Sequence, residues 1–117
     1  MTRQRNDSHS TEFGLWLRLQ SEIDSQLGYV TTNIDYLWRN YKTGDWMLIE
    51  EKRHGGQMSY SQSQMFAVID RACSDEPHYH GFHLLVFENT SPEDGKMWLD
   101  KLEIDKIGLL DFLRFRK

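Results

Sequence analysis

The chain has 117 residues and a formal net charge of −4 at pH 7, with 27% charged and 13% aromatic residues. This length suits one globular domain with a single hydrophobic core, and the composition excludes a disordered chain. The single cysteine, Cys73, excludes an intrachain disulfide and a cysteine-based zinc site. The negative charge argues against indiscriminate nucleic-acid binding, so any such binding would depend on local basic groups.

The polar start of the chain predicts a flexible tail over residues 1–10, followed by a single domain over residues 11–117. The first eleven residues contain no apolar stretch of the kind that a signal peptide needs. No apolar run approaches the length that spans a membrane. We therefore expect a cytoplasmic protein without a membrane partner.

The first helix is expected to begin near Ser10 or Thr11, because either residue can cap it. Apolar residues then recur at spacings of three and four, which predicts one buried stripe. The stripe comprises Trp16, Leu19, Ile23 and Leu27. Glu12 falls on the same stripe, where a carboxylate is unusual. Gly28 is suited to ending this helix, and residues 29–32 predict a short first strand.

Residues 33–53 predict a β-hairpin, because two arms rich in aromatic and branched residues flank turn-forming residues. Pairing Asp35 with Glu50 leaves residues 42–43 or 41–44 as the loop. A register shifted by two residues pairs Asp35 with Lys52 instead. Directly opposed residues share a face of the sheet, so either register gathers Asp35, Glu50 and Lys52 on one face. Two carboxylates and an ammonium group suit a divalent cation and a phosphate.

A second helix is expected after a flexible loop at residues 54–58. Ser61 and Gln64 have the spacing of a capping box, which marks a helix start. Apolar residues continue at helical spacing to about Cys73, which we expect to be a buried helix residue.

The last part of the chain predicts two strands and a helix. Residues 81–88 contain a nearly continuous apolar run, which favours a strand buried on both faces. Residues 97–104 alternate in character and predict an edge strand. Asp105 can cap a final helix that extends to Phe115.

An aspartate followed by a hairpin and a Glu-x-Lys motif resembles the PD-(D/E)XK phosphodiesterase superfamily. Archaeal-type Holliday junction resolvases and many restriction and phage nucleases belong to it. The matching residues are Asp35, Glu50 and Lys52, and Ile34 stands where the superfamily's name has a proline. The resemblance covers roughly residues 12–89. It implies an α/β fold with a restriction-endonuclease-like core, a central mixed sheet of about four to five strands flanked by helices.

The resemblance also implies a catalytic site. Asp35 and Glu50 would hold Mg²⁺ or Mn²⁺, and the backbone carbonyl of Glu51 would contribute to the same metal site. Lys52 would contact the attacking water or the scissile phosphate. The alternative is that residues 50–53 form a solvated strand end with paired charges.

Two further residues resemble parts of this site. Glu12 corresponds to an acidic residue that many superfamily members carry on the first helix, where it helps to bind metal; alternatively it is a first-turn glutamate stabilised by the helix dipole. Gln64 resembles the glutamine that resolvase-like members carry after the Glu-x-Lys motif; alternatively it is an ordinary capping-box residue. Gln62 is the competing candidate.

These features predict a metal-dependent nuclease that acts on DNA, with branched or structured DNA implied by the resemblance alone. A homodimer would let two sites meet two strands. The rival interpretation is a catalytically inactive nuclease-fold module that binds nucleic acid or a protein. A zinc site is not expected from His78, His80 and His83, because no cysteine or acidic partner lies nearby in the sequence in the required pattern. Basic residues near both ends are either solvated or contact phosphates: Arg3, Arg5, Arg114, Arg116 and Lys117.

Overall fold

The computed structural model describes residues 11–116. Internal contacts divide the chain into two compact units, Met1–Thr31 and Thr32–Lys117. The predicted tail at residues 1–10 lies outside the described residues, and the single domain predicted over residues 11–117 stays a prediction. Within residues 11–116, no helix combines the length and the apolar character that crossing a bilayer requires.

The first unit contains one short helix and two 3-10 turns. These elements are α2 (Glu12–Arg18), η1 (Ser21–Ile23) and η2 (Ser25–Leu27). Thr11 caps α2 as predicted, because its hydroxyl oxygen accepts a hydrogen bond from the backbone N–H of Gly14 at 3.0 Å.

The prediction of a long first helix with a buried stripe is wrong. The helix ends at Arg18, and the side chains of Trp16 and Leu19 are exposed. The reason lies in the polar residues that follow. The Asp24 carboxylate accepts from the backbone N–H of Gln26, and such local bonds compete with a continuous helix.

The second unit is built on a five-stranded mixed sheet with the strand order β1-β2-β3-β4-β5. Strands β2 and β3 are parallel, and the other neighbouring pairs are antiparallel. The strands are β1 (Tyr36–Arg39), β2 (Trp46–Lys52), β3 (Tyr79–Phe87), β4 (Met97–Leu99) and β5 (Leu102–Ile104). This arrangement confirms the predicted α/β class and the mixed sheet.

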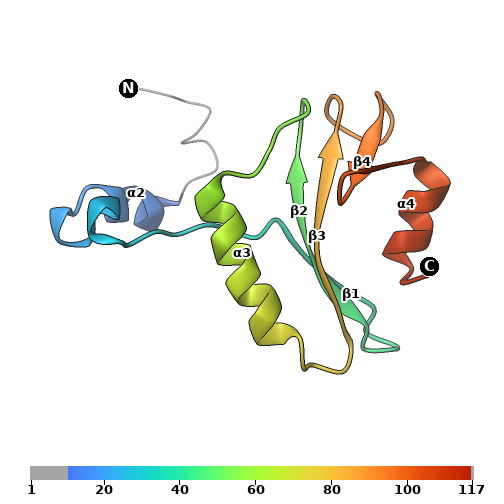
Figure 1. Ribbon diagram of the computed structural model, residues 1–117, viewed down its shortest axis with the longest axis horizontal. Coiled ribbons are helices and arrows are strands. Elements are labelled where there is room, and N and C mark those ends of the chain that lie inside the picture. Colours follow the sequence, from blue (N-terminus) through green and yellow to red (C-terminus); the bar gives the residue numbers. More distant parts are fainter. Residues whose placement is uncertain (1–10, 117) are drawn as a thin grey trace. The chain divides into compact units, whose positions relative to one another are not determined.

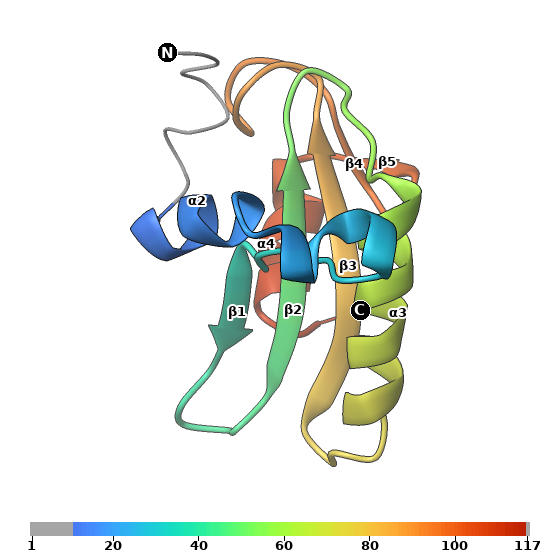
Figure 2. The same cartoon turned by 90° about the vertical axis from the view of Figure 1, so that its left-hand side faces the viewer.

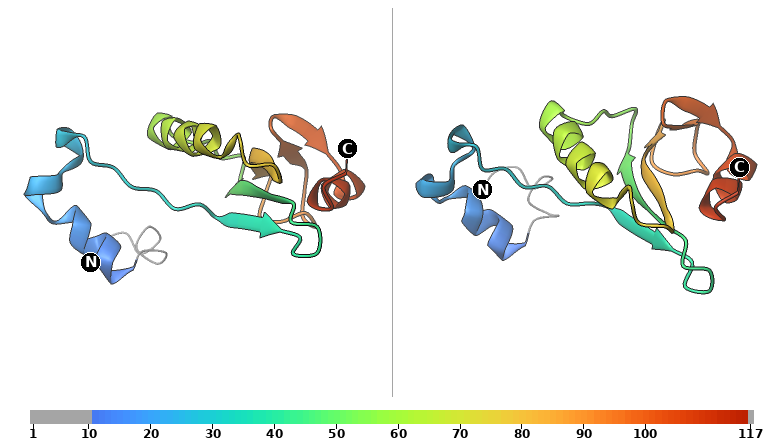
Figure 3. Two further views of the ribbon diagram at one scale, coloured as in Figure 1. Left: turned by 90° about the horizontal axis from the view of Figure 1, so that it is seen from below. Right: turned by 60° about the horizontal axis from the view of Figure 1, so that its bottom comes forward.

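Helices cover both faces of this sheet. The helix α3 (Tyr60–Cys73) supplies the crossover that the parallel pair β2 and β3 requires, and it lies on one face (Figure 1). The helix α4 (Lys106–Leu113) lies behind the sheet in Figure 2, on the face opposite α3, as the two views of Figure 3 also show. Asp105 caps α4 as predicted, accepting from the backbone N–H of Gly108 at 2.8 Å.

The hydrophobic core follows from strand alternation. Side chains on the α4 face form its main cluster, which comprises Met47, Ile49, Leu85, Phe87, Met97 and Leu109. On the α3 face, the rings of Phe66 and Phe82 stack with their centroids 4.5 Å apart. Alternation therefore turns Glu50 and Lys52 toward the α3 face, since Ile49 belongs to the α4 face.

Three further expectations about elements are wrong. Residues 29–32 form no strand, so two strands rather than three precede α3. Residues 97–104 form a tight hairpin rather than one edge strand, because Asp100 and Lys101 adopt the left-handed conformation that a two-residue turn needs. Cys73 is the last residue of α3 and is only partly buried.

Candidate functional site

The hairpin register brings two carboxylates together. Tyr36 pairs with Ile49, which places Asp35 opposite Glu50, and the loop between the strands covers residues 41–44. This is the first of the two predicted registers; the register that pairs Asp35 with Lys52 is wrong. An Asp35 carboxylate oxygen accepts from the backbone N–H of Glu51 at 2.9 Å, which holds Asp35 beside β2.

Among the described residues, Glu50 is the one charged residue that is buried. Its exposed fraction is 4%. Its Oε2 atom lies 3.6 Å from the Lys52 ammonium nitrogen, whereas Oε1 has no hydrogen-bond partner among the described residues. A buried oxygen without a partner is costly and therefore uncommon, which makes it a marker of a ligand-binding position.

Burial raises the pKa of the Glu50 carboxyl to about 7, and the negative charge of Asp35 adds to this increase. The positive charge of Lys52 opposes it without cancelling it. Near neutral pH the Glu50 carboxyl is therefore protonated in part of the molecules. A divalent cation would replace that proton, because carboxylate ligands bind metals in their ionised form.

Lys52 is held from α3. Its ammonium group donates to Oε1 of Gln62 at 3.0 Å, and its side chain is 22% exposed. The same glutamine closes a capping box with Ser59 at the start of α3. Gln62 therefore links the first turn of this helix to the lysine of the Glu-x-Lys motif.

The capping box predicted at Ser61 and Gln64 is wrong. The box is formed two residues earlier by Ser59 and Gln62, and Gln64 is exposed. The sequence contains both spacings, so the pattern alone cannot choose between them. When Ser59 caps the helix, α3 begins at the exposed Tyr60 and buries Phe66 against the sheet.

The neighbouring charges point to the other face of β2. The Glu51 carboxylate accepts from the Tyr36 hydroxyl at 3.0 Å and pairs with the Arg53 guanidinium at 2.9 Å. Arg53 therefore lies on the face of the sheet opposite Lys52, as strand alternation requires. The side chain of Glu51 is engaged away from Asp35 and Glu50, which leaves only its backbone carbonyl for the predicted metal contact.

Glu12 belongs to the other unit. It is an exposed residue in the first turn of α2, where a carboxylate interacts favourably with the helix dipole. Its participation in the site stays a prediction, because it lies within Met1–Thr31 and the remaining site residues lie within Thr32–Lys117.

The three histidines contact two different carboxylates. His80 lies 3.0 Å and His78 lies 3.8 Å from the Asp45 carboxylate. His83 lies 2.7 Å from the Asp100 carboxylate. Within residues 11–116, no group of three or more His, Cys, Asp or Glu side chains is arranged to hold a metal ion.

The two carboxylates of Asp35 and Glu50 nevertheless suit a hard divalent cation. Carboxylate oxygens are ligands that Mg²⁺ and Mn²⁺ favour, and Mg²⁺ typically keeps several waters beside one or two carboxylates. The partnerless Oε1 of Glu50 supplies a free acceptor at this position. The residues present therefore fit such an ion without a third carboxylate.

A cavity of about 610 Å³ lies next to these residues on the α3 face. Leu84 and Val86 of β3 line it, and they are the direct neighbours of Glu50 and Lys52 across the parallel pair. The remaining lining residues come from the loop after β2, from α3 and from the β4–β5 hairpin: Gly55, Gly56, Gln57, Met58, Ser63, Trp98 and Lys101.

Comparison of the chain with protein-family models, curated proteins and solved structures finds no match.

Proposed function

We propose that this protein is a metal-dependent nuclease that hydrolyses phosphodiester bonds in DNA. The observation that carries the proposal is the buried, partnerless oxygen of Glu50, placed opposite Asp35 and beside Lys52 on one face of the sheet. A structural role alone would leave this oxygen unsatisfied. A site for a cation and a phosphate gives all three side chains a purpose.

Asp35 and Glu50 would hold Mg²⁺ or Mn²⁺, with the Glu51 carbonyl as a further ligand. The ion, when bound, supplies the positive charge that neutralises the phosphoryl oxygens. Ionised Glu50 is required for this, and the raised pKa of its carboxyl means that it loses its proton near neutral pH. Metal affinity is therefore expected to fall as the pH decreases below 7.

Lys52 would contact the scissile phosphate or orient the attacking water. Its ammonium group is fixed between Glu50 and Gln62, so little side-chain freedom is lost when substrate binds. Gln62 takes the position that the resemblance gave to Gln64 and acts as a positioning residue, since it reaches the site through Lys52.

The substrate class follows from the surroundings of the site. The adjacent cavity has a volume of about 610 Å³ and contains Trp98 and Lys101, which suit a nucleobase and a phosphate. An unpaired base reaches such a cavity more easily than a stacked one, which favours structured or branched DNA. A homodimer in the cytoplasm would place two such sites on two strands.

A catalytically inactive module that binds nucleic acid or a protein is the second candidate. The formal net charge of −4 favours it, because an acidic chain binds nucleic acid less readily as a whole. The two candidates differ in whether Lys52 acts on a reacting phosphate.

A cleavage panel tests the proposal. Single-stranded, duplex and four-way-junction DNA are incubated with Mg²⁺, Mn²⁺ or a chelator, using the parent protein and the Lys52→Ala variant. The parent is expected to cut at least one substrate only when metal is present. Lys52→Ala should reduce the rate by about a hundredfold or more, because one electrostatic or proton-transfer contributor is lost.

The matched control is Arg53→Ala, which removes a positive charge from the other face of the same strand and should leave the rate nearly unchanged. Metal binding by Lys52→Ala, measured by calorimetry, should persist. If the parent cuts no substrate with either metal, the nuclease proposal is refuted and the inactive binding module becomes the favoured function. Full activity of Lys52→Ala would assign the chemistry to other residues.

A further inference from the structure

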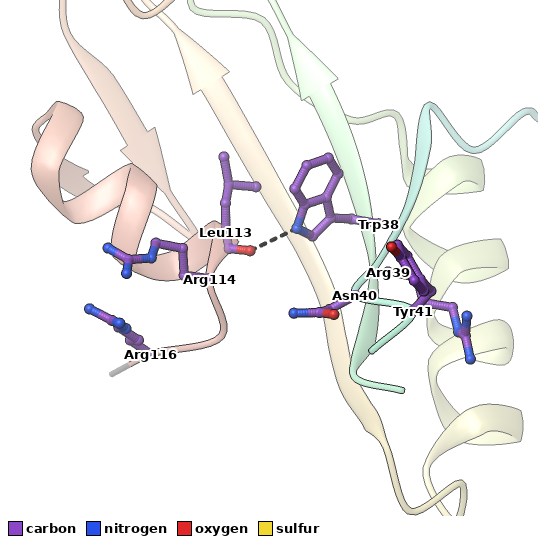
Figure 4. Close-up of a pocket in the computed structure, with 7 residues that line it drawn as sticks. All are labelled: Trp38, Arg39, Asn40, Tyr41, Leu113, Arg114 and Arg116. Carbon is purple, nitrogen blue, oxygen red and sulfur yellow. Dashed lines mark hydrogen bonds between the residues drawn. The ribbon is translucent and has the colours of Figure 1, made fainter. Parts of the chain in front are cut away.

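A second cavity lies on the opposite face of the sheet from Glu50. Its volume is about 540 Å³, and it is formed where β1 and the β1–β2 loop meet the end of α4 (Figure 4). Trp38 faces the α4 side because it pairs with Met47, a member of the core on that side. The lining residues are Trp38, Arg39, Asn40, Tyr41, Leu113, Arg114 and Arg116.

The cavity is rich in positive charge that the protein does not neutralise. Arg39, Arg114 and Arg116 form no ion pair within residues 11–116, and no carboxylate is among the lining residues. In Figure 4 the side chains of Arg114 and Arg116 extend side by side in one direction, while Arg39 extends to the other side. Unpaired guanidinium groups bind phosphate oxygens through paired hydrogen bonds.

The segment that carries Arg114 and Arg116 is firmly held. The indole N–H of Trp38 donates to the Leu113 carbonyl at 2.7 Å, which fixes the end of α4 against β1. Phe115 has a left-handed φ of 61° and packs its ring 4.8 Å from the ring of His80. An anchored phenylalanine between two arginines presents both guanidinium groups from a defined backbone.

Aromatic and amide groups accompany these charges. Tyr41 is 78% exposed and Trp38 is 43% exposed, although large aromatic side chains usually become buried. The side-chain oxygen Oδ1 of Asn40 accepts from the backbone N–H of Lys42, which leaves the side-chain amide nitrogen Nδ2 as a donor. The end of a helix favours a nearby cation, but that effect does not account for exposed aromatic residues.

We propose that this cavity binds a single-stranded segment of nucleic acid, with Arg114 and Arg116 on phosphates and Tyr41 stacked on a base. Alternating arginines and aromatic faces are the chemistry that recognises unpaired strands without sequence preference. A nucleic-acid strand supplies a phosphate for the arginines and a base face for Tyr41 in every nucleotide. This binding does not depend on hydrolysis at Asp35 and Glu50.

The position of the cavity defines its use. Trp38 lies on the edge strand β1, and Asp35 directly precedes that strand, so the two lie about 10 Å apart along the chain direction. They face opposite sides of the sheet, and β1 has no further strand beside it. A strand bound at this cavity is therefore a different segment from the one at the carboxylates, as a forked or branched molecule would supply.

The test measures binding in a chelator, where hydrolysis is excluded. Fluorescence anisotropy follows the parent and the Arg114→Ala/Arg116→Ala variant on a labelled oligodeoxythymidylate of about 20 nucleotides. The double variant is expected to bind roughly tenfold or more weakly and to lower the salt slope by about 1.4, as the loss of two phosphate contacts requires. Tyr41→Ala should weaken binding about fivefold or more, through lost stacking.

The control is Lys96→Ala/Lys106→Ala, which removes the same charge from exposed positions outside the cavity and should bind like the parent. Equal weakening in both double variants would overturn the proposal in favour of net charge alone. Absence of oligonucleotide binding by the parent would also overturn it. Binding without cleavage in metal would support this cavity while removing the proposed nuclease activity.

Discussion

Replacing Glu50 with glutamine should stabilise the metal-free protein at high pH. The raised pKa of the Glu50 carboxyl means that the folded state keeps a proton between pH 4.5 and about 7 that the unfolded state has released. The folded protein therefore loses stability as the pH rises through this range. The change from 4.5 to about 7 corresponds to about 3 kcal/mol of unfolding free energy.

Urea unfolding with a chelator, repeated from pH 4 to 8, measures this contribution. The stability of Glu50→Gln minus that of the parent is expected to grow by about 3 kcal/mol across this range. Glu103→Gln, which changes an exposed carboxylate on β5, is the control and should follow the parent at every pH. If the difference in unfolding free energy between Glu50→Gln and the parent stays constant with pH, the raised pKa of Glu50 is refuted, and with it the main support for the site.

Three further outcomes are expected. Saturating Mg²⁺ or Mn²⁺ should raise the melting temperature of the parent, by the equivalent of about 2.7 kcal/mol at a hundredfold excess over Kd, and should have no effect on Asp35→Asn; equal shifts in both would contradict the metal site. Gln62→Ala should lower kcat more than it changes KM and cost about 1 kcal/mol in urea unfolding through the lost cap, whereas Gln64→Ala should match the parent in both assays. Burial lowers the pKa of His83, but its hydrogen bonds to Asp100 and to the His80 carbonyl outweigh this effect and leave the pKa raised. His83 therefore contributes stability below pH 6.5 that is lost as the pH rises. NMR titration of Asp100→Asn should give a lower pKa for His83, and an unchanged pKa would contradict the pairing with Asp100.

The sequence predicted the site hairpin well because two constraints act on it together. The turn residues restrict the loop, and the aromatic and branched arms must keep one face against the core, so only a few registers are compatible with both. Asp105 was equally predictable as a cap, since a capping aspartate directly precedes the apolar run of α4.

The wrong predictions share a different origin. Trp16 and Leu19 have helical spacing with Ile23 and Leu27, but periodicity does not reveal whether a partner surface exists, and Asp24 begins a new turn instead. Asp100 readily adopts the left-handed conformation of a tight turn, but Lys101 rarely does, so the pair lacks the glycine that usually marks such a turn in a sequence. The choice of Gln62 over Gln64 depends on how α3 packs its Phe66, which is a tertiary effect.

The edge position of β1 gives the two parts of the candidate site different local stability. Glu50 and Lys52 belong to a central strand that is paired on both sides, whereas Asp35 precedes a four-residue edge strand whose residues are all exposed. Edge segments with few buried contacts open far more often than central strands, without global unfolding. Local opening of β1 would therefore separate Asp35 from Glu50 and Lys52 while the rest of the sheet stays folded. A cation held by both Asp35 and Glu50 would favour the closed form of this edge strand.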